Sequence, residues 1–241
     1  MPGRVRVVLS DLDDTLFDHA HATRRALATV RDGTPGLEGV PLDDLQARHA
    51  ELLEELHLDV LAGRVSIADA RAERFARLLA SAGVTDARER SRRVAGVYRD
   101  AYEASWRAVP GAVALLASLG RAGVPVVIVT NNVEDEQRVK LERCGLAGAI
   151  TALVTSEREG VSKPDVRIFA SALRRVSAAA AEAVMFGDAW AADIAGARQA
   201  GIRAVWLNRF GAPRPDAAVP EVTALEPVDA VVEALGVETR S

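Results

Sequence analysis

The stretch Val7-Val8-Leu9-Ser10-Asp11-Leu12-Asp13-Asp14-Thr15-Leu16 decides the fold class, because an apolar strand pattern ends there in a cluster of acids. Three carboxylates fall within four residues, and a hydroxyl follows them. Like charges at such short range repel one another, and a bound cation removes that cost. Carboxylate oxygens are donors that suit Mg²⁺. Ligands of open α/β sheets bind beyond the carboxyl ends of the strands, so the stretch predicts a metal-dependent site.

Asp is also common in turns and at helix N-termini, so the rest of the chain must decide between the two readings. Five apolar, β-branched segments are predicted to be buried strands, and helical patterns of crossover length lie between the last four. This alternation favours a parallel α/β sheet with right-handed crossovers. The predicted strands are Val5–Ser10, Pro125–Thr130, Ile150–Thr155, Ala183–Phe186 and Arg203–Leu207. The predicted helices are Gly111–Ala122, Glu134–Cys144, Val166–Arg175, Ala191–Ala200 and a closing helix at Val228–Leu235, with a surface loop at Pro213–Pro220.

Residues 17–108 carry no strand signal and instead show four amphipathic helix patterns. Ser66 and Asp69 indicate one helix N-terminus, and Gly83 indicates the end of that helix. The sequence therefore predicts two domains, a core of residues 1–16 and 109–241 and a helical domain of residues 17–108. A helical insert that directly follows the acidic strand end is a candidate cap, which excludes water and supplies specificity. The alternative is a subdomain that serves packing alone.

Composition narrows the class of protein. Of the 241 residues, 49% are hydrophobic and 27% are charged, which is ordinary for a globular protein. The net charge of −4 gives no sign of a nucleic-acid or membrane partner, and no apolar run reaches membrane-spanning length. The apolar stretch near the N-terminus is too short for a signal peptide, and the single Cys144 allows no internal disulfide. We expect a cytoplasmic protein that is a monomer or a homodimer.

Polar residues follow four of the predicted strands at the point where each strand ends. They are Asp11, Asp13 and Thr15 after the first strand, Thr130 and Asn131 after the second, Lys163 beyond the third, and Asp188 and Asp193 after the fourth. All of them are expected at the carboxyl edge of one sheet. Each group has an ordinary loop or turn explanation by itself, whereas their order, one set per strand, is specific.

These residue types together suit phosphoryl transfer. An aspartate can attack phosphorus as a nucleophile, and a second carboxylate two residues away can act as acid and then as base. A hydroxyl and backbone N–H groups can hold phosphate oxygens, and a lysine supplies a compact positive charge. Further carboxylates complete an oxygen shell for Mg²⁺.

Lysine is rare in this chain, since only Lys140 and Lys163 among the 30 basic residues are lysine. A chain that uses arginine almost everywhere else can need lysine where it keeps one, and the alternative is a surface lysine that is there by chance. Lys163 is expected to be functional. Lys140, on the helix after the second strand, is expected to be an ordinary surface lysine that tolerates arginine.

The chain resembles the haloacid dehalogenase superfamily over nearly its full length. Asp11-Leu12-Asp13-Asp14-Thr15 is similar to the first motif of that family, Thr130 to the second, Lys163 to the third, and Gly187-Asp188 with Asp193 to the fourth. The stretches Ser162-Lys163-Pro164-Asp165 and Asp193-Ile194-Ala195-Gly196-Ala197 resemble the subfamily with a helical cap between the first two motifs. The resemblance implies a Rossmann-like parallel core, an inserted α-helical cap domain and the phosphatase branch of the family.

The resemblance also implies roles for individual residues. Asp11 would be the nucleophile and a ligand of Mg²⁺, and Asp13 the general acid/base, with its backbone carbonyl also on the metal. Lys163 would be catalytic and would hold the substrate phosphate together with Thr130 and Asn131. Asp188 would be a metal ligand, with Asp193 and Thr15 as supporting neighbours.

The expected function is hydrolysis of a small phosphorylated metabolite, such as a nucleotide, a sugar phosphate or phosphoglycolate, through an aspartyl-phosphate. Three alternatives stay open at this point. Dehalogenases of the family lack an acid at the second position, so Asp13 speaks against them. A phosphomutase of the β-phosphoglucomutase type shares all four motifs. A binding module without activity would not need the intact set of acids, lysine and hydroxyl.

Overall fold

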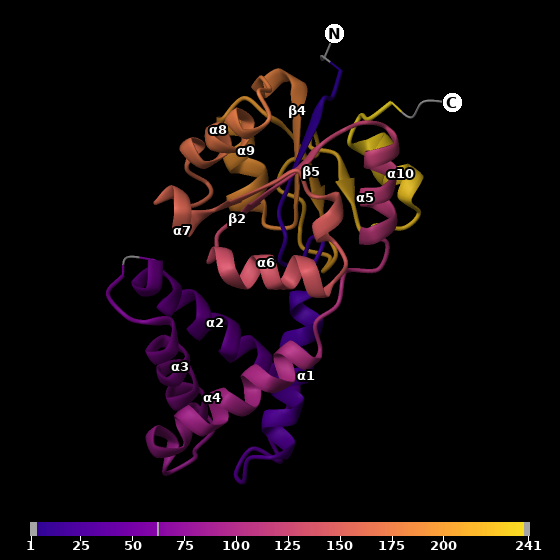
Figure 1. The fold of residues 1–241 in the computed structure, drawn as a ribbon. Helices are drawn as coiled ribbons and strands as arrows, with labels where there is room; N and C mark the ends of the chain where they lie inside the picture. The colour runs from indigo at the N-terminus through magenta and orange to yellow at the C-terminus, as the bar shows by residue number, and fades with distance from the viewer. Residues whose placement is uncertain (1–3, 62, 239–241) are drawn as a thin grey trace. The chain divides into compact units, whose positions relative to one another are not determined.

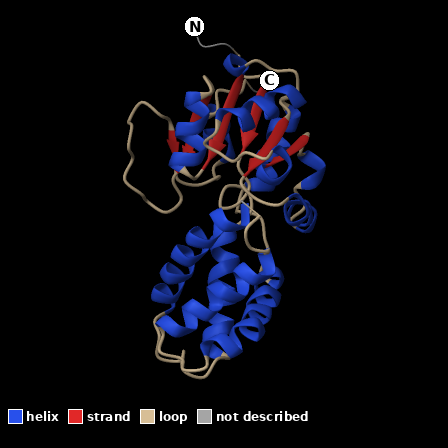
Figure 2. Cartoon of the chain, turned by 90° about the vertical axis from the view of Figure 1, so that its left-hand side faces the viewer, coloured by secondary structure: helices blue, strands red, loops and turns tan. Residues whose placement is uncertain are grey.

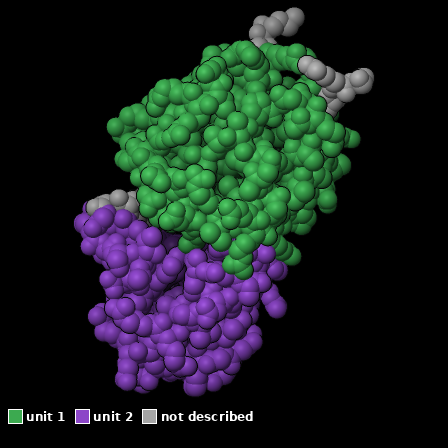
Figure 3. All heavy atoms as spheres, in the orientation of Figure 1, with its two compact units in different colours: residues 1–18, 107–241 green, residues 19–106 purple. Residues whose placement is uncertain are grey.

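The computed structural model describes residues 4–61 and 63–238 of the chain. It divides into two compact units, residues 1–18 with 107–241 and residues 19–106, which Figure 3 colours separately. These bounds lie within two residues of the domain bounds that we predict from the sequence. The helical unit is thus a single insertion that follows the first strand of the other unit.

The larger unit contains one six-stranded sheet in which every neighbouring pair of strands is parallel (Figures 1 and 2). The order is β3-β2-β1-β4-β5-β6. The strands are β1 (Val7–Ser10), β2 (Val126–Thr130), β3 (Ala152–Thr155), β4 (Ala183–Gly187), β5 (Arg203–Leu207) and β6 (Glu221–Val222). Five strands match the predicted ones, and the parallel α/β fold class is confirmed. The short strand β6, which follows the predicted surface loop, was not expected.

Helices cover both faces of this sheet. Figure 1 shows α8 and α9 on one face and α5 with α10 on the other, and α5 packs against α10. The helices and helical turns of this unit are α5 (Ala112–Arg121), α6 (Glu134–Arg143), η1 (Ala147–Ala149), α7 (Ser156–Glu159), α8 (Val166–Arg175), η2 (Ala180–Glu182), η3 (Trp190–Ala195), α9 (Gly196–Gln199) and α10 (Val228–Ala234). Since both faces are covered, the strands are buried and nearly continuous in apolar residues.

Strand β1 lies at the point where the strand order of the sheet reverses. The chain passes from β1 outward to β2 and β3, and then returns to β4 on the other side of β1. The register pairs Ser10 of β1 with Ile128 of β2 and with Phe186 of β4. Ligands of such sheets bind in the crevice beyond the carboxyl ends of the strands at this switch point. The acids after Ser10 therefore lie where the fold provides a site.

The helical unit consists of four helices, α1 (His19–Asp32), α2 (Leu42–Leu61), α3 (Ile67–Ser81) and α4 (Ala87–Ala104). Helix α4 packs against α1 and α3, and α2 packs against α3. The predicted N-terminus at Ser66 is confirmed, because its hydroxyl accepts a hydrogen bond from the Asp69 amide at 3.1 Å.

The core of the helical unit contains a buried histidine among aromatic rings. The His49 ring centroid lies 5.8 Å from that of Phe75 and 5.0 Å from that of Tyr98. The Arg74 guanidinium lies over both neighbouring rings, 5.7 Å from the Phe75 centroid and 5.8 Å from the Tyr98 centroid. His49 is 1% exposed, and its Nε2 atom has no hydrogen-bond partner. His49, Phe75 and Tyr98 thus form a ring cluster inside the unit, with Arg74 against it.

Among the residues that the structure describes, no helix has both the length and the apolar character that a membrane crossing requires.

Candidate active site

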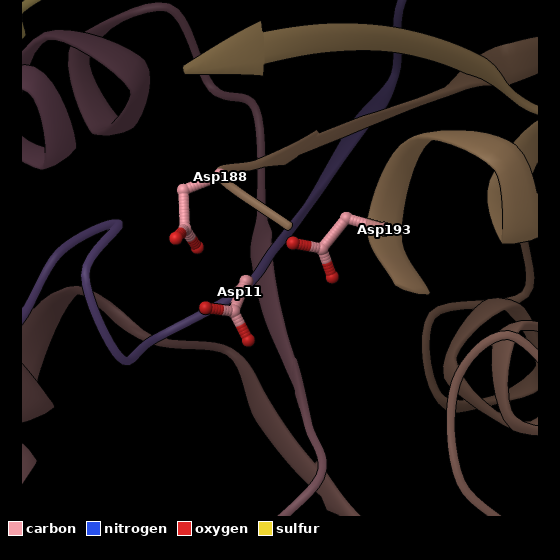
Figure 4. Close-up of side chains that lie close together, drawn as sticks. All are labelled: Asp11, Asp188 and Asp193. Atoms are coloured by element: carbon pink, nitrogen blue, oxygen red, sulfur yellow. The ribbon is translucent and has the colours of Figure 1, made fainter. Parts of the chain in front are cut away.

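Three carboxylates from three segments meet at the switch point of the sheet. Asp11 follows β1, Asp188 follows β4, and Asp193 lies on the π-helical turn η3. Each offers an oxygen atom, and these atoms lie within 4.8 Å of one another. The three side chains point toward a common centre in Figure 4. The backbone fixes the first of them, since the Asp11 amide donates a hydrogen bond to the Phe186 carbonyl of β4 at 2.9 Å.

Lys163 bridges two members of this carboxylate group. Its Nζ atom lies 2.6 Å from Asp11 Oδ1 and 2.6 Å from Asp193 Oδ1, and the side chain is 3% exposed. Burial works against the charged form, but Asp11 and Asp193 raise the pKa of Lys163 above its ordinary value, so the side chain stays cationic. The lysine thus presents a fixed positive charge beside the proposed nucleophile, and its catalytic role stays a prediction.

Asn131 holds the loop that carries this lysine. Its amide nitrogen donates to the Lys163 carbonyl at 2.9 Å, and its amide oxygen accepts from the Lys163 backbone N–H at 2.7 Å. The sequence assigns Asn131 to the substrate phosphate. In the structure both polar ends of its side chain bond to the Lys163 backbone, and its contact with a substrate phosphate stays a prediction. Its backbone N–H stays a candidate for the phosphate.

The electrostatics of the carboxylate group call for a further cation. Burial raises the pKa of Asp11 to about 7, with Asp193 and Asp13 adding to the rise and Lys163 opposing it. Burial also raises the pKa of Asp188 to about 8, and Asp11 and Asp193 add to that rise. One lysine does not balance three carboxylates, of which Asp11 and Asp193 are buried and Asp188 is partly buried. A divalent cation with oxygen ligands would restore the balance, so the donor set fits Mg²⁺.

Asp193 is held more firmly than the other two carboxylates. It accepts hydrogen bonds at both oxygens, from Lys163 Nζ at Oδ1, 2.6 Å away, and from the Ala189 amide at Oδ2, 3.0 Å away. Asp11 also accepts from Lys163 Nζ at Oδ1, whereas its Oδ2 atom has only a longer contact with the Thr15 hydroxyl among the residues that the structure describes. Asp11 and Asp188 share the hydroxyl of Thr15, at 3.4 Å and 3.2 Å respectively. Thr15 therefore contacts both proposed ligands, and its supporting role stays a prediction.

Asp13 lies apart from this group and is held by a different lysine. Its Oδ1 atom lies 2.6 Å from Lys140 Nζ, and its Oδ2 atom accepts from Gln137 Nε2 at 2.7 Å and from Asn132 Nδ2 at 3.3 Å. The Asp13 carboxylate is therefore not among the three that converge. Only its backbone carbonyl remains a predicted metal ligand.

The expectation that Lys140 is a surface lysine is wrong. Lys140 is 1% exposed and forms an ion pair with Asp13. Sequence reasoning missed it, together with Gln137, because α6 is a polar helix without a clear apolar face. The available signal was spacing, since Gln137, Lys140 and Leu141 are the buried residues of α6 and follow each other at i, i+3 and i+4.

Thr130 ends β2 with a buried hydroxyl that accepts a hydrogen bond from Gln137 Nε2 at 3.1 Å. Its predicted contact with a substrate phosphate stays a prediction. The same amide nitrogen also donates to Asp13, so Gln137 links the end of β2 to the loop after β1.

Trp206 is a further site residue that sequence reasoning missed. It lies in β5 in register with Gly187, and its indole N–H donates to the Asp188 carbonyl at 2.7 Å. The Trp190 ring packs edge-on against it at 5.1 Å between centroids. The contact fixes the backbone of one proposed metal ligand. Nothing in the local sequence signals it, because it depends on the pairing of β4 with β5.

Comparison with known proteins agrees with this geometry. Residues 5–201 match the family model described as haloacid dehalogenase-like hydrolase. The phosphoserine phosphatase of Thermus thermophilus is 33% identical over 90% of this chain and 94% of its own length.

Two solved structures have the same fold. A HAD-hydrolase of Bacillus subtilis, YfnB, solved with bound magnesium, is 26% identical with a TM-score of 0.76, over 96% of this chain and all of that one. A 2-haloacid dehalogenase of Pseudomonas syringae is 29% identical with a TM-score of 0.61, over 95% of this chain and 98% of that one. The fold is thus shared by enzymes with different named reactions, and the site residues must decide between them.

Proposed function

The chain belongs to the haloacid dehalogenase-like hydrolases and is a phosphoric monoester hydrolase among them, and we propose that it cleaves a small phosphomonoester with Mg²⁺ through an aspartyl-phosphate. The observation that carries the proposal is the pairing of two acids with two buried lysines. Asp11 is paired with Lys163 inside the carboxylate group, and Asp13 is paired with Lys140 just outside it. In the proposal, Asp11 attacks phosphorus and Asp13 moves a proton.

In the first step, a carboxylate oxygen of Asp11 forms a bond to phosphorus while the bond between phosphorus and the ester oxygen breaks. The departing alkoxide takes a proton from the Asp13 carboxyl group and leaves as an alcohol. Lys163 stabilises the negative charge that shifts onto the phosphoryl oxygens, because its ammonium is already fixed in a water-poor site.

In the second step, a water molecule attacks the phosphorus of the aspartyl-phosphate. Asp13, now a carboxylate, accepts a proton from that water. The bond between phosphorus and the Asp11 oxygen breaks, so that inorganic phosphate leaves and the Asp11 carboxylate is restored. The balance of the two steps is one phosphomonoester and one water converted into one alcohol and one phosphate.

Asp11 and Asp188, with the backbone carbonyl of Asp13, are the proposed ligands of Mg²⁺. When bound, the ion would neutralise the buried carboxylates and offset the negative charge of the substrate phosphate. The raised pKa values of Asp11 and Asp188 support this assignment, because they mark negative charge that the protein alone leaves unbalanced. Asp193 instead holds Lys163, and Thr15 holds Asp11 and Asp188.

The substrate class in this proposal is a small phosphorylated metabolite. The presence of an acid at position 13 supports phosphoryl transfer over dehalogenation, since attack on carbon needs no proton for a halide that leaves. Three further points stay predictions. The helical unit is expected to act as a cap, the protein is expected in the cytoplasm, and it is expected to work as a monomer or a homodimer.

A phosphate-release screen tests the function directly. The purified chain is incubated with nucleotides, sugar phosphates, phosphoglycolate and phosphoserine, in parallel with 2-chloropropionate for halide release. We expect phosphate release from at least one ester, no halide, and loss of activity after chelation that Mg²⁺ restores and Ca²⁺ does not. Full phosphatase activity after exhaustive chelation contradicts the metal, and halide release contradicts the reaction. Transfer of the phosphoryl group within a sugar bisphosphate, in place of its release, would reveal the mutase alternative.

A further inference from the structure

Helix α6 places two buried polar side chains on Asp13. Gln137 is fully buried and Lys140 is 1% exposed, although the helix that carries them is rich in charged residues. Lys140 Nζ lies 2.6 Å from Asp13 Oδ1, and Gln137 Nε2 lies 2.7 Å from Asp13 Oδ2. Each oxygen of the carboxylate thus has its own donor from the same helix, one turn apart.

Stability alone is a poor explanation for a lysine in this place. Removing an ammonium group from water is costly, and apolar side chains of similar volume are often as stabilising as a buried ion pair. The charge of Lys140 is met by Asp13, by Glu136 at 3.5 Å and by the face of the Phe17 ring, 4.7 Å from its centroid. These three neighbours stabilise the charged form of the Lys140 side chain.

The donors fix the orientation of the Asp13 carboxylate as well as its place. A carboxylate gripped at one oxygen can still rotate about its Cβ–Cγ bond, whereas a grip on both oxygens stops that rotation. Gln137 is itself anchored, because its Nε2 atom also lies 3.1 Å from Thr130 Oγ1 at the end of β2. The carboxylate is thereby set in position relative to the end of β2, where Thr130 stands.

We infer that Lys140 and Gln137 are positioning residues, which hold the Asp13 carboxyl group at the angle from which it exchanges a proton with the leaving group and then with water. The inference rests on the proposed function, in which Asp13 is the general acid/base. It adds that α6, a crossover helix outside the four motifs, is part of the machinery through these two side chains.

The test compares two substrates whose leaving groups differ in their need for a proton. Alkoxide leaving groups need protonation, whereas p-nitrophenolate departs without it, so only the former depends on a well-placed acid. Lys140→Met removes the ammonium and keeps the length of the side chain. Arg138→Met makes the matched change two residues away on the same helix, where the side chain is 58% exposed.

We expect Lys140→Met to lower kcat/KM by roughly 10²-fold on an alkyl phosphomonoester, the order that general acid catalysis supplies, and by less than about tenfold on p-nitrophenyl phosphate. Arg138→Met should change neither value by more than about twofold. Equal losses on both substrates would mean that Lys140 serves the fold or phosphate binding instead, and that outcome overturns the inference. So does a loss of less than about threefold on the alkyl ester.

A double-mutant cycle keeps the inference testable if Lys140→Met folds poorly. In the unaltered background, Gln137→Leu should lower kcat/KM on the alkyl ester by about tenfold or more. In an Asp13→Ala background, the same change should lower kcat/KM by less than about threefold, because Gln137 acts through Asp13. Additive losses overturn the inference. If the unaltered chain hydrolyses no phosphomonoester, the proposed function has failed and this inference falls with it. If it does and the cycle is additive, only the inference has failed.

Discussion

The Asp193 carboxylate lies directly against the backbone of Gly187, so closely that a Cβ atom on residue 187 would come within 2.2 Å of Asp193 Oδ2. This approach lets Asp193 turn back from the π-helical turn η3 and reach both the Ala189 amide and Lys163 Nζ. A glycine before Asp188 is therefore required by the carboxylate that anchors the lysine. The same two residues stand in the fourth motif on which the family resemblance rests.

Gly187→Ala should displace Asp193 and leave Lys163 with one carboxylate partner in place of two. We expect kcat/KM to fall by roughly 10- to 10²-fold, in the range of a misplaced catalytic group. Gly120→Ala is the matched control, since a Cβ at position 120 meets nothing within 4 Å. Helical alanine is favoured over glycine, so this control should keep full activity and gain about 0.5–1 kcal/mol in stability. Equal activity of the two variants would show that Asp193 has room to move without effect.

Asp11→Asn should abolish turnover and leave the fold intact. Asparagine fills the same space, but its amide is too weak a nucleophile to form the aspartyl-phosphate. The substitution removes the charge of Asp11, which burial disfavours, as the raised pKa of Asp11 indicates. The free energy of unfolding should therefore not fall steeply. Phosphate release and covalent labelling by radioactive phosphate would both be measured. Near-normal turnover in the folded variant would rule out the covalent mechanism.

Lys163→Arg should lower kcat/KM by roughly 10²-fold or more, about 2.7 kcal/mol of transition-state stabilisation. The planar guanidinium is longer than the ammonium and cannot occupy a point between Asp11 and Asp193, each 2.6 Å from Nζ. Neither lysine of the chain is exposed, so no surface lysine can serve as the control. The control is instead Arg167→Lys, the opposite exchange at an arginine whose side chain is 71% exposed. Steady-state kinetics on one accepted ester checks both variants. Small and equal effects would show that Lys163 is not the third motif.

His49 should make the unfolding free energy depend on pH. Burial, with Arg74 and then His19, lowers the pKa of His49 well below its ordinary value. The unfolded chain therefore binds a proton below about pH 6.5 that the folded protein does not, so this group costs stability as the pH falls, by about 1.4 kcal/mol per pH unit.

His49→Met should remove that dependence, because methionine fills the ring cluster without a titrating group. Denaturant unfolding of both proteins between pH 5 and 7.5 gives the difference in their free energies, in which the contributions of Asp11 and Asp188 cancel. The unaltered protein should lose stability relative to the variant below about pH 6.5. A difference that stays constant across this range would mean that His49 becomes protonated in place.

Local signals in the sequence located most of the regular structure. Helix α8 begins at Val166 and ends at Arg175 as predicted, because its apolar period and its flanking residues agree. Strand β6 escaped prediction because two residues carry no pattern of their own. It exists through its pairing with β5, in which the Trp206 amide donates to the Pro220 carbonyl and the Asn208 amide to the Val222 carbonyl.

The sequence by itself determined the parallel sheet, the helical insertion and the order of the acids and the lysine along the strand ends, because strand ends, caps and turns are written in neighbouring residues. Only the tertiary structure decided which groups face one another. Lys140 and Asp13 are 127 residues apart, and no local pattern tells a buried cation from a solvated one. Asp13, which follows β1, is the partner that makes burial of Lys140 tolerable. The place of Lys140 in the site therefore follows from the packing of α6 against the sheet and not from the helix itself.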